Sequence, residues 1–173
     1  MERGDIVEVV RLGKHYIDKA EQARWHVMEC QKRYDEAMSK LDKLRRRMVF
    51  VEDGTPNTLE LLSALMELEE VKEDKKGAEN KLKNFITASI SYTLSAVDVL
   101  NTDSSYINSR IIYVLRQTVV IIRAIRELNI DFSSISSQVV QTRIIVNYKS
   151  DVENRIRYVN ISRYLNQLMH SLE

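Results

Sequence analysis

Hydrophobic residues recur with a seven-residue period through the first fifty residues of the chain. Two columns hold the repeat, and each member of the second column follows a member of the first by three residues. Such columns, kept over more than six heptads, are typical of the a and d positions of a coiled coil. The pattern therefore predicts one long helix over about residues 5–50. The columns are Ile6, Gly13, Ala20, Val27, Tyr34, Leu41 and Met48, then Val9, Tyr16, Ala23, Cys30, Ala37, Leu44 and Val51.

A second pair of columns follows a strong turn signal. Residues 52–57 read Glu-Asp-Gly-Thr-Pro-Asn, a combination that ends helices and forms turns. The next helix is predicted from about 58 to 100, and two long helices joined by a short turn pack antiparallel. Continuing the register from the turn pairs Tyr34 with Lys75 and Gly13 with Ala96. The columns are Leu61, Leu68, Lys75, Leu82, Ser89 and Ala96, then Ala64, Val71, Ala78, Phe85, Tyr92 and Val99.

The hydrophobic pattern changes near residue 84. Ten of the eleven lysines precede this position, and fourteen of the sixteen isoleucines follow it. Two further helices are predicted over about 106–128 and 134–171. The segment 111–125 is apolar over most of its helical surface, which indicates burial by several neighbours. The lysine-rich half shows little apolar surface beyond the two columns, as expected of a thin two-helix arm.

The predicted fold class is all-α: a long antiparallel helical hairpin (coiled coil) with two further helices forming a four-helix body at its open end. A single helical domain is expected over residues 1–173. Its body comprises about 5–30 and 84–171, and about 31–83 form a projecting coiled-coil arm. The third helix, at roughly 35 Å, covers only the open half of the hairpin.

Composition excludes several classes of protein. The chain is 44% hydrophobic and 29% charged, which is typical of a globular protein, and four Gly with one Pro are too few for an all-β fold. A net charge of +1 gives no overall signature of a nucleic-acid coat or membrane binder. No signal peptide is recognisable, and no apolar run reaches the ~20 residues of a membrane span. We expect an intracellular (cytoplasmic) or virion-interior location.

The sequence offers little for catalysis. It has no Gly-x-Ser-x-Gly elbow and no Gly-rich phosphate loop, and Cys30 is the sole cysteine, at a seam position typical of a small buried hydrophobe. His26 and Cys30 stand four residues apart beside Glu29, but two ligands without a second pair are weak evidence for zinc. We therefore expect no enzymatic activity, no cofactor and no metal.

A basic cluster at the predicted end of the hairpin is the first candidate contact site. Arg45, Arg46 and Arg47 directly precede a Met-Val-Phe-Val run that includes Phe50. These residues suit an anionic membrane into which Phe50 inserts, a nucleic-acid backbone, or an acidic protein surface. In the competing interpretation, Met48 and Val51 complete the seam, and the arginines interact with the helix macrodipole.

The predicted last helix is the second basic candidate. It carries Arg143, Arg155, Arg157 and Arg163, with tyrosines between them. These residue types grip phosphates on nucleic acids. The alternative is a solvated face, with Tyr148 and Tyr158 on the core stripes.

Apolar surface that one body cannot hide predicts a homo-oligomer or another helical partner. The candidate oligomer surface is Ile111, Ile112, Val119 and Ile122 on the third helix. The function expected is therefore that of a structural, assembly or protein–protein interaction protein, such as a virion, filament or secretion-apparatus component. The alternative is membrane-surface or nucleic-acid binding through the two arginine-rich segments.

Overall fold

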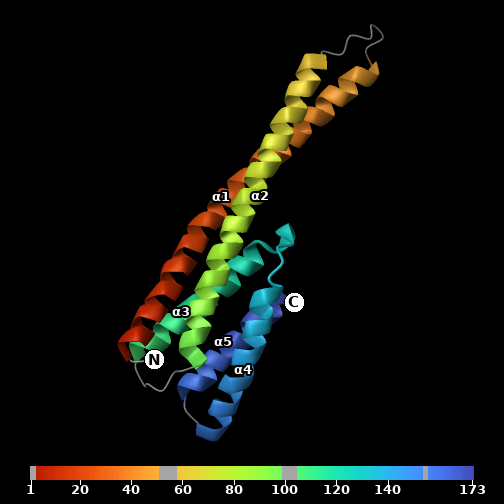
Figure 1. The fold of residues 1–173 in the computed structure, drawn as a ribbon. Coiled ribbons are helices and arrows are strands. Elements are labelled where there is room, and N and C mark those ends of the chain that lie inside the picture. Colours follow the sequence, from red (N-terminus) through yellow and green to blue (C-terminus); the bar gives the residue numbers. More distant parts are fainter. Residues whose placement is uncertain (1–2, 51–57, 99–104, 154–155) are drawn as a thin grey trace. The chain divides into compact units, whose positions relative to one another are not determined.

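Every regular element that the computed structural model describes is helical (Figure 1). The described residues are 3–50, 58–98, 105–153 and 156–173, without the side chains of residues 3, 48–50, 153 and 156–157. The all-α class is confirmed, as is the antiparallel hairpin of two long helices. The elements are α1 (Arg3–Phe50), α2 (Thr58–Asp98), α3 (Ser105–Ala124), the short 3₁₀ helix η1 (Arg126–Leu128), α4 (Ser133–Glu153) and α5 (Ile156–Leu172).

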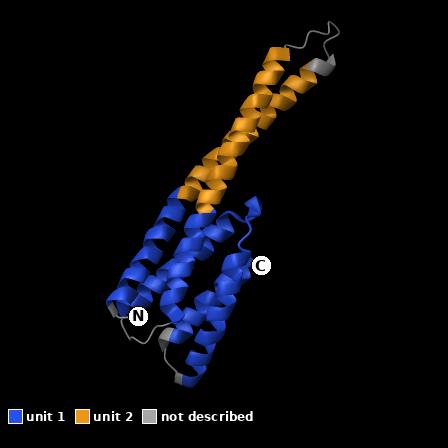
Figure 2. Cartoon of the chain, viewed as in Figure 1, with its two compact units in different colours: residues 1–22, 83–173 blue, residues 23–82 orange. Residues whose placement is uncertain are grey.

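The chain divides into two compact units (Figure 2). Unit 1 comprises Met1–Gln22 and Lys83–Glu173, and unit 2 comprises Ala23–Leu82. The change in hydrophobic pattern near residue 84 falls close to the boundary between the units after Leu82. That the two units form a single domain from which an arm projects stays a prediction.

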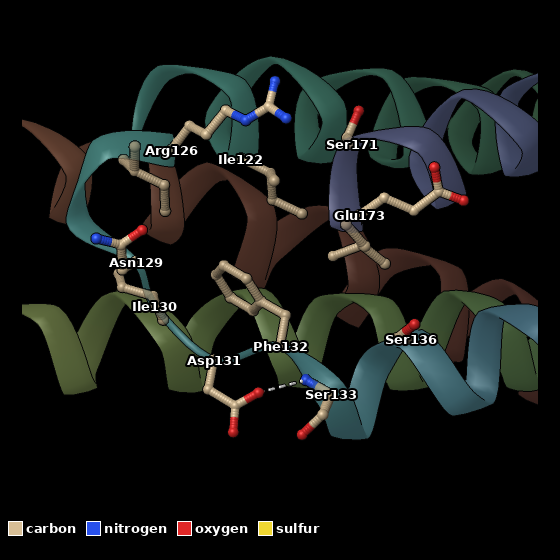
Figure 3. A pocket seen from close by; sticks show the side chains of 12 residues that line it. Ile122, Arg126, Asn129, Ile130, Asp131, Phe132, Ser133, Ser136, Ser171 and Glu173 are labelled. Atoms are coloured by element: carbon tan, nitrogen blue, oxygen red, sulfur yellow. Dashed lines mark hydrogen bonds between the residues drawn. The ribbon is translucent and has the colours of Figure 1, made fainter.

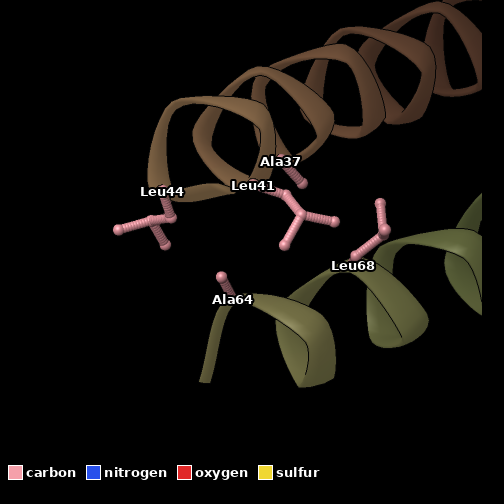
Figure 4. Packing of buried hydrophobic residues seen from close by; sticks show 5 residues of the cluster. All are labelled: Ala37, Leu41, Leu44, Ala64 and Leu68. Carbon is pink, nitrogen blue, oxygen red and sulfur yellow. The ribbon is translucent and has the colours of Figure 1, made fainter. Parts of the chain in front are cut away.

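Unit 2 is a two-helix coiled coil with a narrow seam. Among its described residues, every buried side chain occupies a predicted column position. Figure 4 shows Ala37, Leu41 and Leu44 of α1 facing Ala64 and Leu68 of α2. The Lys75 ammonium lies 4.8 Å from the Tyr34 ring centre, so this predicted pair is confirmed. The buried set is Val27, Cys30, Ala37, Leu41, Leu44, Ala64, Leu68, Val71, Ala78 and Leu82.

Unit 1 contains the first part of α1, the last part of α2, and the three shorter helices. Helix α3 packs against α5, and α5 packs against α4. Side-chain hydrogen bonds join α4 to α2 through Ser91 and Gln138, at 3.1 Å, and α5 to α4 through Ser162 and Asn147. At 100° per residue, the core side chains of α3 lie within about 160° of its circumference, so the helix has one wide buried face and is not buried all round. The core side chains are Ile107, Ile111, Val114, Leu115, Thr118, Val119, Ile121 and Ile122.

The prediction of one long last helix over 134–171 is wrong. The structure has two helices there, α4 and α5, so three helices rather than two accompany the hairpin. No glycine or proline occurs between 133 and 173, and local sequence therefore gave no signal of the break. The reversal of the chain lets α5 bury Tyr158, Ile161, Leu165 and Leu168 against α3 and α4, which one straight helix would leave uncovered.

The helix register in unit 1 also differs from the heptad prediction. In α1 the second buried column is Val10 and Ile17, whereas Val9 and Tyr16 are half-buried. Gly13 faces Ser89 and Thr93 instead of Ala96. Additional helices pack on α1 in unit 1. The buried face of α1 is therefore wider than the seam of a two-helix coiled coil, and it is rotated around the helix relative to that seam.

Candidate interaction surfaces

The arginines at the end of α1 are all exposed, as their position in the pattern predicted. Arg45, Arg46 and Arg47 are consecutive, so their side chains fan around the helix instead of sharing one face. Arg47 lines a shallow groove of about 390 Å³ between α1 and α2, together with Lys43 and Glu60. The side chain of Phe50 lies outside the described residues, and its predicted role with the arginines stays a prediction.

An exposed apolar row on α2 was missed by the sequence analysis. Leu59, Leu62 and Met66 follow the i, i+3, i+7 spacing of one helix face, and Leu59 and Met66 are 78% and 66% exposed. We call these three residues, with the adjoining Leu65, the α2 row. Leu59, Leu62 and Met66 line a groove of about 680 Å³ that continues along α2 to acidic side chains. The spacing was visible in the sequence, but the seam columns beside it gave the stronger signal. The acidic lining is Glu67, Glu69, Glu70 and Glu73.

The candidate oligomer surface on α3 is mostly core. Ile111, Val119 and Ile122 are buried, and Ile112 is half-buried. Helix α5, which the sequence did not predict as a separate helix, packs against α3, so the chain itself covers this helix. As placed here, these side chains offer no open apolar face to a partner.

Among its described residues, unit 1 leaves an apolar face open on α4. Ile144, Tyr148 and Val152 are each more than half exposed, and Tyr148 is 68% exposed. We call these three residues the α4 row. The assignment of Tyr148 to a core stripe is therefore wrong, whereas Tyr158 is buried as predicted.

The arginines of the C-terminal segment do not line one helix, because that segment forms two antiparallel helices. Arg143 on α4 is half-buried, and Arg163 on α5 is exposed. Arg155 and Arg157 lie outside the residues whose side chains are described. Lys149 is directed inward: its ammonium donates to the Asp98 carbonyl at 3.4 Å and lies 5.8 Å from the Tyr158 ring centre. This geometry weakens the case for a continuous phosphate-binding face.

Cys30 is buried in the seam of unit 2, and its Sγ lies 3.8 Å from His26 Nε2. Burial is the main cause that raises the pKa of the thiol above its usual value. Among the described residues, no group of three or more His, Cys, Asp or Glu side chains is placed to hold a metal ion. The pair is thus two adjacent polar atoms at the edge of a coiled-coil core.

The thiol of Cys30 is expected to react with iodoacetamide at least about tenfold more slowly in the folded chain than in urea. Burial excludes the reagent, and the raised pKa reduces the thiolate fraction at neutral pH. Mass spectrometry of timed samples at pH 7.5 measures both rates. Equal rates would mean that the unit 2 seam is open in solution.

A cavity of about 410 Å³ lies in unit 1 where the turn after α3 meets the end of α5 (Figure 3). Apolar side chains such as Ile122 and Phe132 line it beside polar ones such as Arg126 and Ser136. Asp131 Oδ1 accepts a hydrogen bond from the Ser133 backbone N–H at 2.9 Å, which caps α4 and lowers the pKa of this carboxyl group. Asp131 therefore serves the start of α4.

A polar cluster joins α1 to α3 in unit 1. The Tyr113 hydroxyl donates to Asp18 Oδ1 at 2.9 Å, and the Lys14 ammonium lies 2.7 Å from Asp18 Oδ2. The hydrogen bond to Asp18 is the main cause that raises the pKa of the Tyr113 hydroxyl, with desolvation second. The cluster fixes how α3 docks on α1.

Replacing Tyr113 by phenylalanine is expected to lower the free energy of unfolding by about 1 kcal/mol at pH 7. Because the folded-state pKa is raised above the ordinary 10.0, the contribution is fully present below pH 10 and is lost as the pH rises through the folded-state pKa. Urea unfolding of both proteins at about pH 7, 9 and 11 tests this. A difference that grows with pH would contradict the assigned hydrogen bond.

In the described part of the chain, no helix is long and apolar enough to cross a membrane. Comparisons with protein-family models, with curated proteins and with solved structures found no match.

Proposed function

We propose that this chain is a non-enzymatic structural, assembly or protein–protein interaction protein that acts through coiled-coil and helical-bundle packing. The observation that supports the proposal is that seven of its exposed large apolar side chains gather in two rows at helical spacing. The α2 row lies in unit 2, and the α4 row lies in unit 1. Subunits of virions, filaments and secretion apparatus are proteins of this kind.

The energetic argument follows from burial of apolar surface. Each fully buried Leu, Ile or Met contributes about 1.5–3 kcal/mol, and scattered single exposed residues need no explanation. Three or four on one helix face are different, because a second helix can cover them together. A partner helix with a matching apolar row would bury all of these side chains in one contact. Packing of one helix against another is the simplest geometry for such a contact.

The second candidate is binding to an anionic membrane or to nucleic acid. The observation that favours it is the exposure of Arg45, Arg46 and Arg47, which leaves three guanidinium groups available to phosphates. Membrane binding predicts co-sedimentation with vesicles that contain phosphatidylserine, and nucleic-acid binding predicts steep salt dependence. Both effects should be lost when Arg45 and Arg46 are replaced by glutamate.

The deciding experiment is the absolute mass of the protein by light scattering on a sizing column, at about 0.1 M and 1 M salt. The proposed function predicts a defined oligomer at both salt concentrations, since apolar burial is not screened. Vesicle co-sedimentation and the ratio of absorbance at 260 and 280 nm are measured on the same samples. A monomer that binds vesicles or nucleic acid would replace the proposal by the second candidate.

A further inference from the structure

We infer that unit 2 has two complementary side faces, and that a basic face of α1 in one copy packs on the outer, acidic and apolar face of α2 in the next copy. This inference rests on the assembly function proposed above, and it names the partner as a second copy of the chain. The contact joins two different surfaces, so each copy keeps one face for a further copy. Contacts of this kind build rings or open rows of subunits.

Three cations form the basic face of α1. Lys43, Arg46 and Arg47 follow the i, i+3, i+4 spacing of one helix face, and all three are exposed. In the heptad register, where the seam takes positions a and d, they occupy positions c, f and g. Arg45 takes position e, on the other side of the helix. Lys43 and Arg47 also line the groove of about 390 Å³ described above.

The outer face of α2 begins with the apolar α2 row and continues as an acidic surface. Leu59 and Met66 take heptad position f, which lies directly opposite the seam. Glu70 and Glu73 follow at positions c and f, so they extend the same face by one to two turns. All four side chains line the groove of about 680 Å³.

The two faces are complementary in charge. Positions c, f and g of residues 32–47 carry six basic residues and one acidic residue, a net charge of +5. Positions b, c and f of residues 59–73 carry three acidic residues and no basic residue, a net charge of −3. Packing α1 of one copy on α2 of the next therefore brings opposite charges together, whereas packing α2 on α2 would oppose like charges.

The ion pairs within unit 2 leave these charges without a partner. Across the hairpin, Arg33 pairs with Asp74 at 3.4 Å, and Lys40 pairs with Glu67 at 3.1 Å. In the part of the chain that the structure describes, no ion pair involves the three cations of the basic face or the two carboxylates that follow the row. These residues are Lys43, Arg46, Arg47, Glu70 and Glu73.

The register of the contact follows from the hairpin. When neighbouring hairpins point the same way, α1 of one copy runs antiparallel to α2 of the next. Within one chain the ion pair sets Lys40 level with Glu67. A shift of six residues, roughly 9 Å, brings Lys43 level with Glu70 of the next copy and Arg47 level with Met66. The aliphatic part of the arginine side chain then covers apolar surface while its guanidinium group reaches the acidic side chains.

The same geometry curves a row of hairpins. Lys43 at position c is turned by about 50° from the direction opposite the seam, at 3.5 residues per turn. Leu59 and Met66 lie directly opposite the seam, so successive hairpins are rotated in one sense. A row that rotates in this way can close into a ring. We therefore expect a discrete oligomer larger than a dimer.

Sedimentation velocity of the full chain, from about 1 to 300 µM, tests the two faces separately. The α1-face variant carries Lys43→Glu with Arg47→Glu, and the α2-face variant carries Leu62→Gln with Met66→Gln. Each variant alone should associate at least about 30-fold more weakly than the unchanged chain. Each keeps one intact face, so an equimolar mixture should form a 1:1 dimer and nothing larger. An α1-face variant that still forms dimers by itself would show that α2 rows pack on each other, and would overturn the inference.

A charge exchange tests the pairing of the faces. A variant with Glu70→Lys and Glu73→Lys should associate at least about tenfold more weakly by itself. Mixed with the α1-face variant, it should restore the full oligomer, because exchanged and original charge pairs then alternate around the assembly. Recovery also shows that both variants are folded. A mixture that stays monomeric excludes the pairing of α1 with α2 of the next copy.

The matched control places the same change in net charge on the other side of the hairpin. Arg45→Glu with Lys72→Glu alters the net charge by −4, as the α1-face variant does, but both residues occupy position e. Association should stay within about twofold of the unchanged chain. A loss as large as that of the α1-face variant would mean that overall charge controls association, and would count against the proposed faces.

The outcomes separate this inference from the proposed function. An oligomer that both face variants leave unchanged, but that is lost on Ile144→Glu with Tyr148→Glu, overturns the inference and keeps the assembly function. A chain that is monomeric at all concentrations overturns both. A monomer that co-sediments with phosphatidylserine vesicles, and loses this binding in the α1-face variant, would assign the basic face to a membrane and overturn the inference.

Discussion

Replacing Gly13 by alanine is expected to destabilise the protein by about 1–2 kcal/mol, whereas the same change at Gly77 should stabilise it by about 0.5–1 kcal/mol. Both glycines lie inside long helices, where alanine is intrinsically preferred. A Cβ at Gly13 would overlap Thr93 Oγ1 and would lie 3.4 Å from the Ser89 carbonyl oxygen. A Cβ at Gly77 meets no atom within 4 Å. Opposite changes in stability at the two glycines would separate the effect of packing between α1 and α2 from the effect of helix propensity.

The close approach at Gly13 is also held by a hydrogen bond. Ser89 Oγ donates to the Gly13 carbonyl oxygen at 2.7 Å, and this bond is buried. A shift that relieves the overlap would lengthen it, so part of the expected loss is the weakened hydrogen bond. Thr93 Oγ1 itself makes no hydrogen bond among the described residues, which makes its removal inexpensive.

A double-mutant cycle tests this origin of the effect. Thr93→Ala should restore most of the stability lost in Gly13→Ala, with a coupling free energy of about 1 kcal/mol or more. The four proteins are compared by urea unfolding, followed by circular dichroism at 222 nm. Additive effects would mean that the two residues do not meet, and that the heptad pairing of Gly13 with Ala96 deserves a second test.

The hairpin could be predicted from the sequence because its signal is periodic and local. In unit 2 each helix packs against one other helix, so burial is confined to the two columns. From Val27 to Leu44, every apolar column residue is buried or half-buried. Toward unit 1 this simplicity ends. Val10 and Ile17 become core because other helices, distant in the sequence, cover a second side of α1.

The faces of α4 could not be assigned from its sequence for a related reason. The helix carries two apolar stripes, and the structure buries the one that contains Ile135, Val139 and Val146 together with the polar Thr142. The side chain of Thr142 hydrogen-bonds to Asp98, while burial raises the pKa of that carboxyl group. Partner groups on α2 thus decide which stripe is core, and the stripe with Ile144 and Tyr148 remains outside.

Of the candidate surfaces, one could be predicted from the sequence and the other could not. Exposure of Arg45, Arg46 and Arg47 followed from their place outside the seam columns. The fate of Ile111 and Val119 did not, since it depended on α5, which exists as a separate helix only because the chain reverses after α4. An apolar helix face in a sequence predicts that another element packs against it. Which element does so depends on the tertiary structure.

Leu165→Ala is expected to lower the free energy of unfolding by about 2–5 kcal/mol, the largest loss among the substitutions considered. Leu165 is fully buried on α5, and its burial depends on the reversal between α4 and α5. Val159→Ala is the matched control, because Val159 on the same helix is 50% exposed and should change stability by less than about 1 kcal/mol. Equal effects of the two substitutions would mean that α5 does not pack back on α3 and α4.

A distance measurement checks the reversal itself. Spin labels on Ser137→Cys and His170→Cys, in a Cys30→Ala background, occupy exposed positions near the start of α4 and the end of α5. In the antiparallel pair they lie about 10–20 Å apart, close to the spacing of packed helix axes plus the labels. In one continuous helix they would lie about 50 Å apart. The short distance, together with a large loss in Leu165→Ala, would establish that burial of α5, in the absence of any glycine or proline, breaks the predicted helix.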